Sequence, residues 1–91
     1  MTSEKVAIVT AGGGGIGEGV CRELKDNGYQ LVIMSRSESC ETLAEELGGI
    51  GVRGSVADAG DLENVVNATL EEFGRIDAVV NHTAHPPKGE L

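Results

Sequence analysis

Aromatic side chains, basic residues and long apolar runs are all scarce in this chain of 91 residues. The only aromatic residues are Tyr29 and Phe73, so aliphatic side chains must form a modest core. Lys and Arg number 7 against 15 Asp and Glu, and the net charge of −8 argues against nucleic acid or an anionic membrane as partner. No run approaches a membrane span, and the first residues lack the layout of a signal peptide. We therefore expect a soluble, cytoplasmic protein.

Metal-binding patterns are also lacking. Cys21 and Cys40 have neither metal nor redox spacing, and each lies on the apolar stripe of a predicted helix, so we expect buried free thiols. His82 and His85 are three residues apart but have no obvious third ligand, so no metal site is expected. Asp77 stands at the start of the predicted strand Arg75–Asn81, remote from the expected ligand crevice, and is interpreted as a structural carboxylate.

Glycine, by contrast, is abundant: the chain has 14 glycines, four of them consecutive at Gly12–Gly15. The run follows Val6–Thr10, an apolar stretch without alternation that predicts a strand buried on both faces. From Ile16 onward, apolar residues recur every four positions, which predicts a helix beginning near Gly14–Gly17. Bare glycines leave the free N–H groups and the positive dipole end of that helix open to an anion. The arrangement predicts a pyrophosphate site.

The spacing Gly12-x-Gly14-x-x-Gly17 fits the dinucleotide fingerprint between a strand and a helix. The alternative is a flexible glycine turn without a ligand. A second buried strand, Leu31–Met34, arrives soon after the helix, as the fingerprint requires. The Gly-Lys-Ser/Thr sequence of a P-loop is absent, because Gly17 is followed by Glu18.

Three polar residues, Ser35, Arg36 and Ser37, follow the second strand directly. In a dinucleotide-binding fold this position meets the adenosine ribose, where an acidic residue binds a free 2′-hydroxyl and Arg accommodates a 2′-phosphate. A guanidinium binds phosphate as a planar fork, and the flanking hydroxyls can add donors. The sequence therefore favours NADP(H) over NAD(H). The alternative for Arg36 is a solvated surface charge.

The rest of the chain continues the alternation of strands and helices. We predict a helix over Ser37–Leu47, a short strand over Gly51–Val56, a helix capped by Asp58 and a strand over Arg75–Asn81. Residues 1–91 then form one α/β domain, a Rossmann-like, doubly wound parallel sheet of strand order 3-2-1-4. The ligand crevice lies above the carboxyl ends of the first and fourth strands, beside the glycine loop and Asn81.

Together these features resemble the N-terminal part of the short-chain dehydrogenase/reductase family. The family motif Thr-Gly-x-x-x-Gly-x-Gly corresponds to Thr10–Gly17, with Ala11 in place of the first glycine. The stretch Phe73–Asp77 is also similar, and the resemblance covers residues 5 to about 85. It implies that Gly15, Ile16 and Gly17 line the pyrophosphate.

The resemblance also implies roles further along the chain. Arg36 would select NADP, Val56 would lie by the adenine, and Asn81 would face the cofactor ribose. Ser55 stands where the family has an Asp that meets the adenine amino group.

The family's catalytic Ser and Tyr-x-x-x-Lys pair have no counterpart here, because Tyr29 is followed four residues later by Ile33. We therefore expect the cofactor-binding half of an NADP-dependent oxidoreductase, truncated after the fourth strand, with no catalytic residue. The alternative is a stand-alone, non-catalytic nucleotide-binding or interaction module. A methyltransferase-type domain is a third interpretation, but Arg36 argues against it. The bare edge of the fourth strand, Ile76–Val80, predicts self-association or marginal folding.

Overall fold

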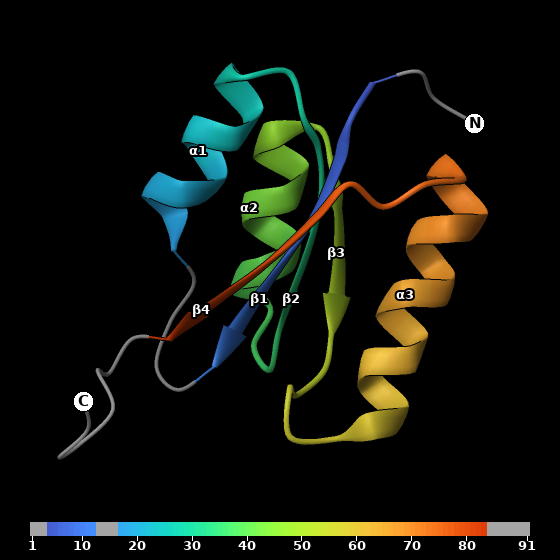
Figure 1. Cartoon of the computed structure of the whole chain (residues 1–91). Helices are drawn as coiled ribbons and strands as arrows, with labels where there is room; N and C mark the ends of the chain where they lie inside the picture. Colours follow the sequence, from blue (N-terminus) through green and yellow to red (C-terminus); the bar gives the residue numbers. More distant parts are fainter. Residues whose placement is uncertain (1–3, 13–16, 84–91) are drawn as a thin grey trace, which may run out of the picture.

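The computed structural model of the chain describes residues 4–12 and 17–83. Strands and helices alternate along the whole described chain, as predicted (Figure 1). The elements are β1 (Val6–Gly12), α1 (Glu18–Asp26), β2 (Gln30–Ser35), α2 (Ser39–Leu47), β3 (Ile50–Arg53), α3 (Ala59–Phe73) and β4 (Ala78–Thr83).

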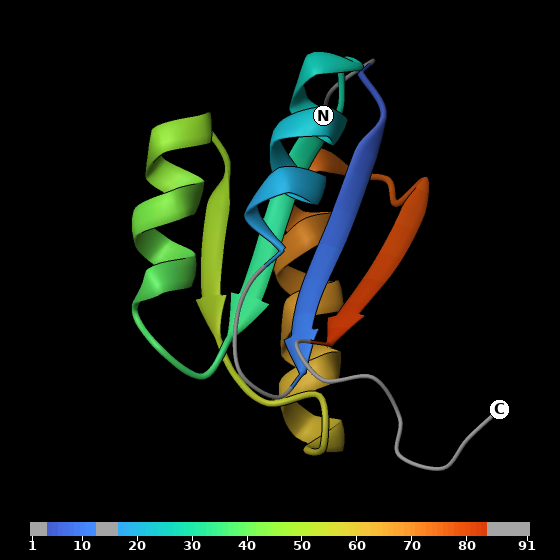
Figure 2. The same ribbon diagram turned by 90° about the vertical axis from the view of Figure 1, so that its left-hand side faces the viewer.

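The four strands form one parallel sheet in the order β3-β2-β1-β4, which confirms the predicted topology. In the register, Thr10 of β1 lies between Met34 of β2 and Asn81 of β4. Helices α1 and α2 cover one face of the sheet and α3 covers the other, so the sheet is doubly wound (Figure 2). All strands end at the same edge, which is the lower edge in Figure 1.

The core has two layers, one on each face of the sheet. Under α1 and α2, Ala7, Val9, Leu31 and Ile33 pack with the helix residues Cys21, Cys40, Leu43 and Ala44. Under α3, Ile8, Val32 and Met34 pack with Val65. Because β1 and β2 have helices on both faces, their sequences are apolar without alternation. Both cysteines are free and buried, as predicted.

Caps define three of the helix ends, and α2 begins at Ser39 rather than at the predicted Ser37. The Asp58 carboxylate accepts hydrogen bonds from the N–H groups of Gly60 and Asp61, which fixes the start of α3. Gly48 and Gly74 end α2 and α3 with φ of 75° and 80°, a left-handed conformation that glycine adopts without steric cost.

The ends of two strands differ from the prediction. β3 stops at Arg53 rather than Val56, because the Ser55 N–H turns to the Asp61 carboxylate at 3.0 Å instead of continuing a strand ladder. β4 starts at Ala78 rather than Arg75, because Arg75 and Asp77 form an ion pair before the strand begins.

Gly19, a glycine within α1, does not serve a close approach of its helix to the sheet, although the third glycine of a dinucleotide fingerprint often has that role. A Cβ at this position would meet nothing within 4 Å, and the residue is exposed. The close approach occurs instead at Gly51, where a Cβ would lie 2.6 Å from the Glu41 Cα of α2.

Helix α3 buries only part of its apolar face. Val65 and Thr69 are buried, whereas Leu62, Val66 and Leu70 are 38%, 37% and 45% exposed. Asp61 lies on the flank of α3 toward β3, so helical geometry puts these three residues on the opposite flank, toward β1 and β4. On the same side of the sheet, Val79 of β4 is 64% exposed. None of the described helices combines the length and hydropathy needed to cross a membrane.

Candidate functional site

The strand order reverses between β1 and β4, and a polar contact marks that point. The Thr10 hydroxyl donates to the Asn81 side-chain oxygen at 3.1 Å. Thr10 is buried and Asn81 is exposed, so Asn81 stands at the surface above the carboxyl ends of both strands. Ligands of open α/β sheets bind at such a reversal. The structure therefore brings these two predicted site residues into contact near the carboxyl ends of β1 and β4.

The start of α1 is the second part of the site. Gly17 is buried at the N-cap position and supplies no side chain to cap the helix. No side chain among the described residues caps the first N–H groups of α1, which suits them to an anion. Gly12 ends β1 on the other side of the loop. Gly14, Gly15 and Ile16, the predicted pyrophosphate contacts within the loop, lie outside the described residues.

A charged network beside this helix start joins α1 to α2. Arg22 donates to Glu18 at 2.6 and 2.8 Å and to Glu46 at 2.7 Å. The hydrogen bond to Glu46, and to a lesser extent the one to Glu18, raises the pKa of Arg22 above its ordinary value. The guanidinium therefore offsets part of the negative charge that Glu18 places near the start of α1.

A groove of about 590 Å³ lies next to this network, between the two helices. Its lining includes Ser37 with Glu18, Glu38 and Glu46, but no Lys or Arg from the described part of the chain. Three carboxylates make the groove unsuitable for a phosphate. A 2′-phosphate at this edge of the sheet would have to turn toward the other side of the β2–α2 turn.

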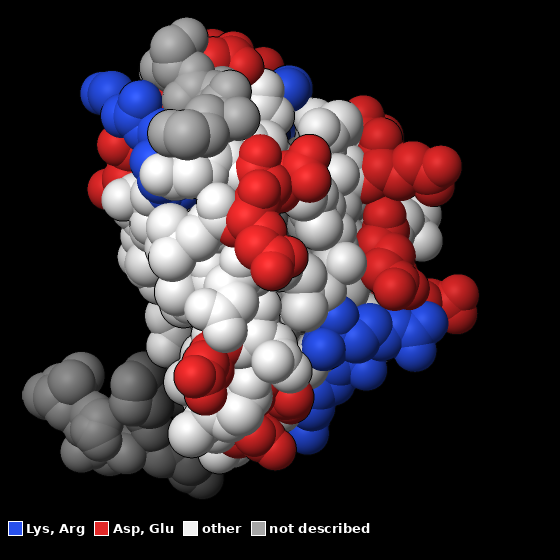
Figure 3. Space-filling view, turned by 90° about the vertical axis from the view of Figure 1, so that its right-hand side faces the viewer, with Lys and Arg blue, Asp and Glu red and all other residues white. Residues whose placement is uncertain are grey.

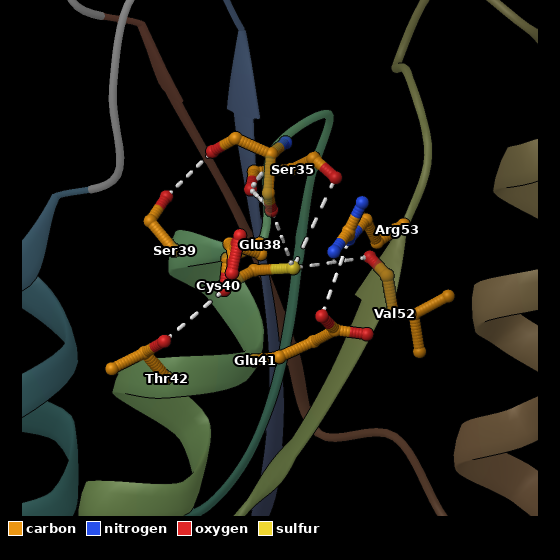
Figure 4. A network of polar contacts seen from close by, with 9 residues as sticks. Ser35, Glu38, Ser39, Cys40, Glu41, Thr42, Val52 and Arg53 are labelled. Carbon is orange, nitrogen blue, oxygen red and sulfur yellow. Dashed lines mark hydrogen bonds and ion pairs between the residues drawn. The ribbon is translucent and has the colours of Figure 1, made fainter.

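Internal hydrogen bonds hold the turn after β2 (Figure 4). The buried Ser35 hydroxyl donates to the Ser37 carbonyl at 3.0 Å and lies 3.4 Å from the Ser37 N–H, which donates to it. The Ser37 hydroxyl contacts that of Ser39 at 2.7 Å and is exposed. Ser35 therefore stabilises the turn, and Ser37 is the hydroxyl that a ligand can reach. Arg36, between them, is exposed.

The thiol of Cys40 packs against the backbone of the same turn. Its Sγ is 3.3 Å from the Ser37 carbonyl oxygen, and the carbonyl oxygens of Val52 and Ser35 lie at 3.7 and 3.9 Å (Figure 4). The thiol is fully buried and sits where β2, β3 and the start of α2 meet. This packing holds Arg36 on a fixed stretch of backbone.

Ser55 and Val56 lie on the turn between β3 and α3 and not on a strand. The Ser55 hydroxyl accepts a hydrogen bond from the Ala57 N–H at 3.1 Å, and its own N–H is bound to Asp61. Val56 is half-buried and packs against the core layer under α3. Both residues follow the carboxyl end of β3, the edge on which the other predicted site residues lie.

The contacts of Asp77 confirm its structural interpretation. Its carboxylate accepts hydrogen bonds from the Val6 N–H at 2.8 Å and from Arg75 at 2.8 Å. The Arg75 guanidinium, followed by the Val6 N–H, lowers the pKa of Asp77. The residue lies where β1 begins, at the edge opposite the site. The side chain of His82 and all of His85 lie outside the described parts, so the expectation that they form no metal site stays a prediction.

The sequence analysis missed Arg53. This exposed residue ends β3, faces Ser35 of β2 in the sheet register and pairs with Glu41 at 3.2 Å. The predicted strand Gly51–Val56 put Arg53 in the middle of a strand, and only the observed end of β3 puts it at the edge of the sheet where the site lies. Figure 3 shows a patch of Lys and Arg in the lower half of the face, toward the strand ends.

Comparison with known proteins identifies the family. The family model for short chain dehydrogenases matches residues 5–90. L-fucose dehydrogenase of Rattus norvegicus is 35% identical over 91 residues, which cover 98% of this chain and 34% of that protein. The chain belongs to the short-chain dehydrogenase family.

Solved structures agree with this assignment. A 3-oxoacyl-(acyl-carrier protein) reductase from Brucella melitensis in complex with NAD is 34% identical, with a TM-score of 0.67 over 99% of this chain and 37% of that one. A tyrosine-to-phenylalanine variant of ElxO with NADPH bound is 28% identical, with a TM-score of 0.71 over 86% of this chain and 34% of that one. The chain spans about a third of the length of these relatives.

Proposed function

We propose that this chain binds NADP(H) and forms the cofactor-binding portion of an oxidoreductase. The observation that carries the proposal is Arg36, exposed on a turn that Ser35 and Cys40 hold at the carboxyl end of β2. This is the position at which dinucleotide-binding folds select between a 2′-hydroxyl and a 2′-phosphate. The relatives whose structures contain NADPH or NAD support a nicotinamide dinucleotide as the ligand.

The described residues fit such a ligand along one edge of the sheet. The uncapped start of α1 suits the pyrophosphate, with Gly12 and Gly17 bounding the loop and Gly14, Gly15 and Ile16 proposed within it. Thr10 and Asn81 suit the ribose next to the nicotinamide. Ser55 and Val56 suit the adenine, and Arg36, on the turn formed by Ser35 and Ser37, suits the 2′-phosphate.

In the whole protein we propose hydride transfer between the nicotinamide and a carbonyl or alcohol carbon, which is the chemistry that this cofactor supplies when bound. Tyr29, the only tyrosine in the chain, precedes β2 at the edge opposite the site, with Lys5 6.0 Å from its ring centre. Tyr29 is therefore not placed to act on a substrate, and this chain binds and orients the cofactor without supplying an acid or base.

Titration of the chain with NADPH and NADH tests the proposal. We expect NADPH to bind more tightly, and Arg36→Gln to weaken NADPH binding by about 10-fold while NADH changes by less than about twofold. Lys25→Gln, in the last turn of α1, is the control with the same loss of charge. A preference for NADH, or an Arg36 variant that binds both cofactors as before, would refute the NADP assignment.

The alternative function, a binding module that works without a catalytic half, makes a different prediction about turnover. Both interpretations predict cofactor binding by this chain without turnover. They differ in whether the encoding frame continues into a Tyr-x-x-x-Lys segment. Carbonyl reduction by these residues alone would contradict both.

We also propose that the chain associates with itself through β4 and that it acts in the cytoplasm. β4 is an edge strand with the exposed Val79 beside the exposed flank of α3, and unpaired apolar edges favour pairing with another chain. Two free, buried cysteines suit a reducing compartment.

A further inference from the structure

Arg53 comes from the strand end next to the one that carries Arg36. Arg53 of β3 and Ser35 of β2 are register partners, and neighbouring strands lie about 4.8 Å apart. The Gly54 N–H donates to the Ser35 carbonyl at 2.9 Å, which fixes the two strand ends together beyond Arg53. The backbones of Arg36 and Arg53 are therefore held close to each other at the edge of the sheet where the site lies.

The Arg53 guanidinium is only partly used. Its Nε donates to Glu41 Oε1 at 3.2 Å, and both side chains are half-exposed, at 54% and 50% (Figure 4). No described residue accepts a hydrogen bond from its two Nη groups. A guanidinium carries five N–H donors, and its outer nitrogens match two oxygens of a phosphate. The contact with Glu41 leaves that outer edge available.

The charge distribution points to the same place. Arg22 is held between Glu18 and Glu46, and Arg75 is paired with Asp77 at the far edge of the sheet. The acidic groove between α1 and α2 repels an anion from the other side of the turn. A phosphate that reaches Arg36 is therefore drawn toward β3.

We propose that Arg53 is a second guanidinium for the 2′-phosphate, and that Glu41 holds it in position and competes with the phosphate for it. This inference rests on the proposed binding of NADP(H). It adds Arg53 as a residue that contacts the ligand and Glu41 as a residue that weakens binding. Both lie outside the turn that carries Arg36.

Two adenosine ligands isolate the phosphate from the rest of the cofactor. We would titrate the chain with adenosine 2′,5′-bisphosphate and with adenosine 5′-monophosphate by calorimetry at low salt. Arg53→Gln should weaken binding of the bisphosphate by about 5- to 20-fold and leave the monophosphate within about twofold. Glu41→Gln should strengthen binding of the bisphosphate by about 2- to 5-fold, because the competing carboxylate is gone. Lys25→Gln is the control with the same change of charge as Arg53→Gln.

The ratio of the two affinities separates a binding role from a structural one. A loss of affinity that is equal for both ligands, or an unchanged ratio in Arg53→Gln, would overturn the role of Arg53. If Arg53→Gln fails to fold by circular dichroism, Arg53→Lys keeps the charge without the fork and should lower the ratio by a smaller factor. If the unaltered chain does not prefer the bisphosphate, or Arg36→Gln does not lower that preference, the NADP assignment itself fails, and Arg53 with it.

Discussion

Asp77 joins the starts of β1 and β4 through both its main chain and its side chain. Its N–H donates to the Val6 carbonyl and its carboxylate accepts from the Val6 N–H, each at 2.8 Å. Arg75 holds the carboxylate in place from the other side. One residue thus closes the end of the sheet opposite the proposed site, which accounts for an acidic residue at the start of an apolar strand.

This geometry predicts how stability depends on pH. The pKa of Asp77 is lower in the folded chain than in the unfolded chain, where it is about 3.9. Its contribution to stability is therefore present above about pH 4 and is lost as the pH falls through the folded value. We expect the melting temperature to fall in acid. In Asp77→Asn this fall should be smaller than in the unaltered chain, because the Asp77 carboxylate is no longer there to be protonated. Thermal unfolding followed by circular dichroism between about pH 3 and about pH 7 measures both.

The control for this experiment is Asp26→Asn, at the exposed end of α1. It should leave the acid dependence as in the unaltered chain. An Asp77→Asn chain with the same acid dependence as the unaltered one would show that the hydrogen bonds of this carboxylate contribute nothing measurable.

Among the elements, α1 and β3 use glycine in opposite ways. Gly19 is exposed within α1 and a Cβ there would meet open space, so Gly19→Ala should stabilise the chain by about 0.5–1 kcal/mol through helix propensity. Gly51 faces the backbone of α2, where a Cβ would lie 2.8 Å from the Cys40 carbonyl oxygen. Gly51→Ala should therefore destabilise the chain by about 1–3 kcal/mol. Urea unfolding of the two variants gives both values, and a loss of stability in Gly19→Ala would contradict the open space at α1.

Patterns within an element predicted the order and type of all seven elements. The four-residue period from Ile16 and the unbroken apolar strands indicate which segments are buried. Asp58 marks a helix start through its side chain, and Gly48 and Gly74 mark helix ends through their left-handed backbone. These are local properties, so a single sequence contains them.

Contacts between elements could not be predicted in this way. The early end of β3 depends on the Asp61 carboxylate reaching back to Ser55, and the close approach at Gly51 depends on how α2 lies on the sheet. Within the candidate site, Arg36 was predicted as a cofactor-binding residue because it comes directly after the second strand. Arg53 emerged only when the register set it opposite Ser35.

At the scale of the whole molecule, the exposed apolar residues lie together on one side. Leu62, Val66 and Leu70 line one flank of α3, and Val79 lies on the neighbouring face of β4. Figure 2 shows no described helix behind β4 on this side, and Figure 3 shows a broad uncharged area on the face that carries α3. A net charge of −8 opposes association of two chains, whereas this area favours it.

Sedimentation measurements test which of the two prevails. We expect association that grows with protein concentration and with salt, because salt screens the charge repulsion but not the apolar contact. Val79→Lys should weaken it, whereas Asn64→Lys, an exposed position on the other flank of α3, should act only through its charge. A monodisperse chain that melts cooperatively as a monomer would contradict the proposed association.

The central place of β1 has a consequence for how the chain is made. One of its two partners, β2, follows within about 30 residues, but the other is the last described strand, and the contacts of Val6 with Asp77 and of Thr10 with Asn81 each span 71 residues. β1, the first of the described strands to be synthesised, therefore cannot complete its pairing until residues near 83 have emerged. Until then the apolar strand β1 remains accessible to chaperones. The rate of synthesis therefore helps to determine the yield of native protein.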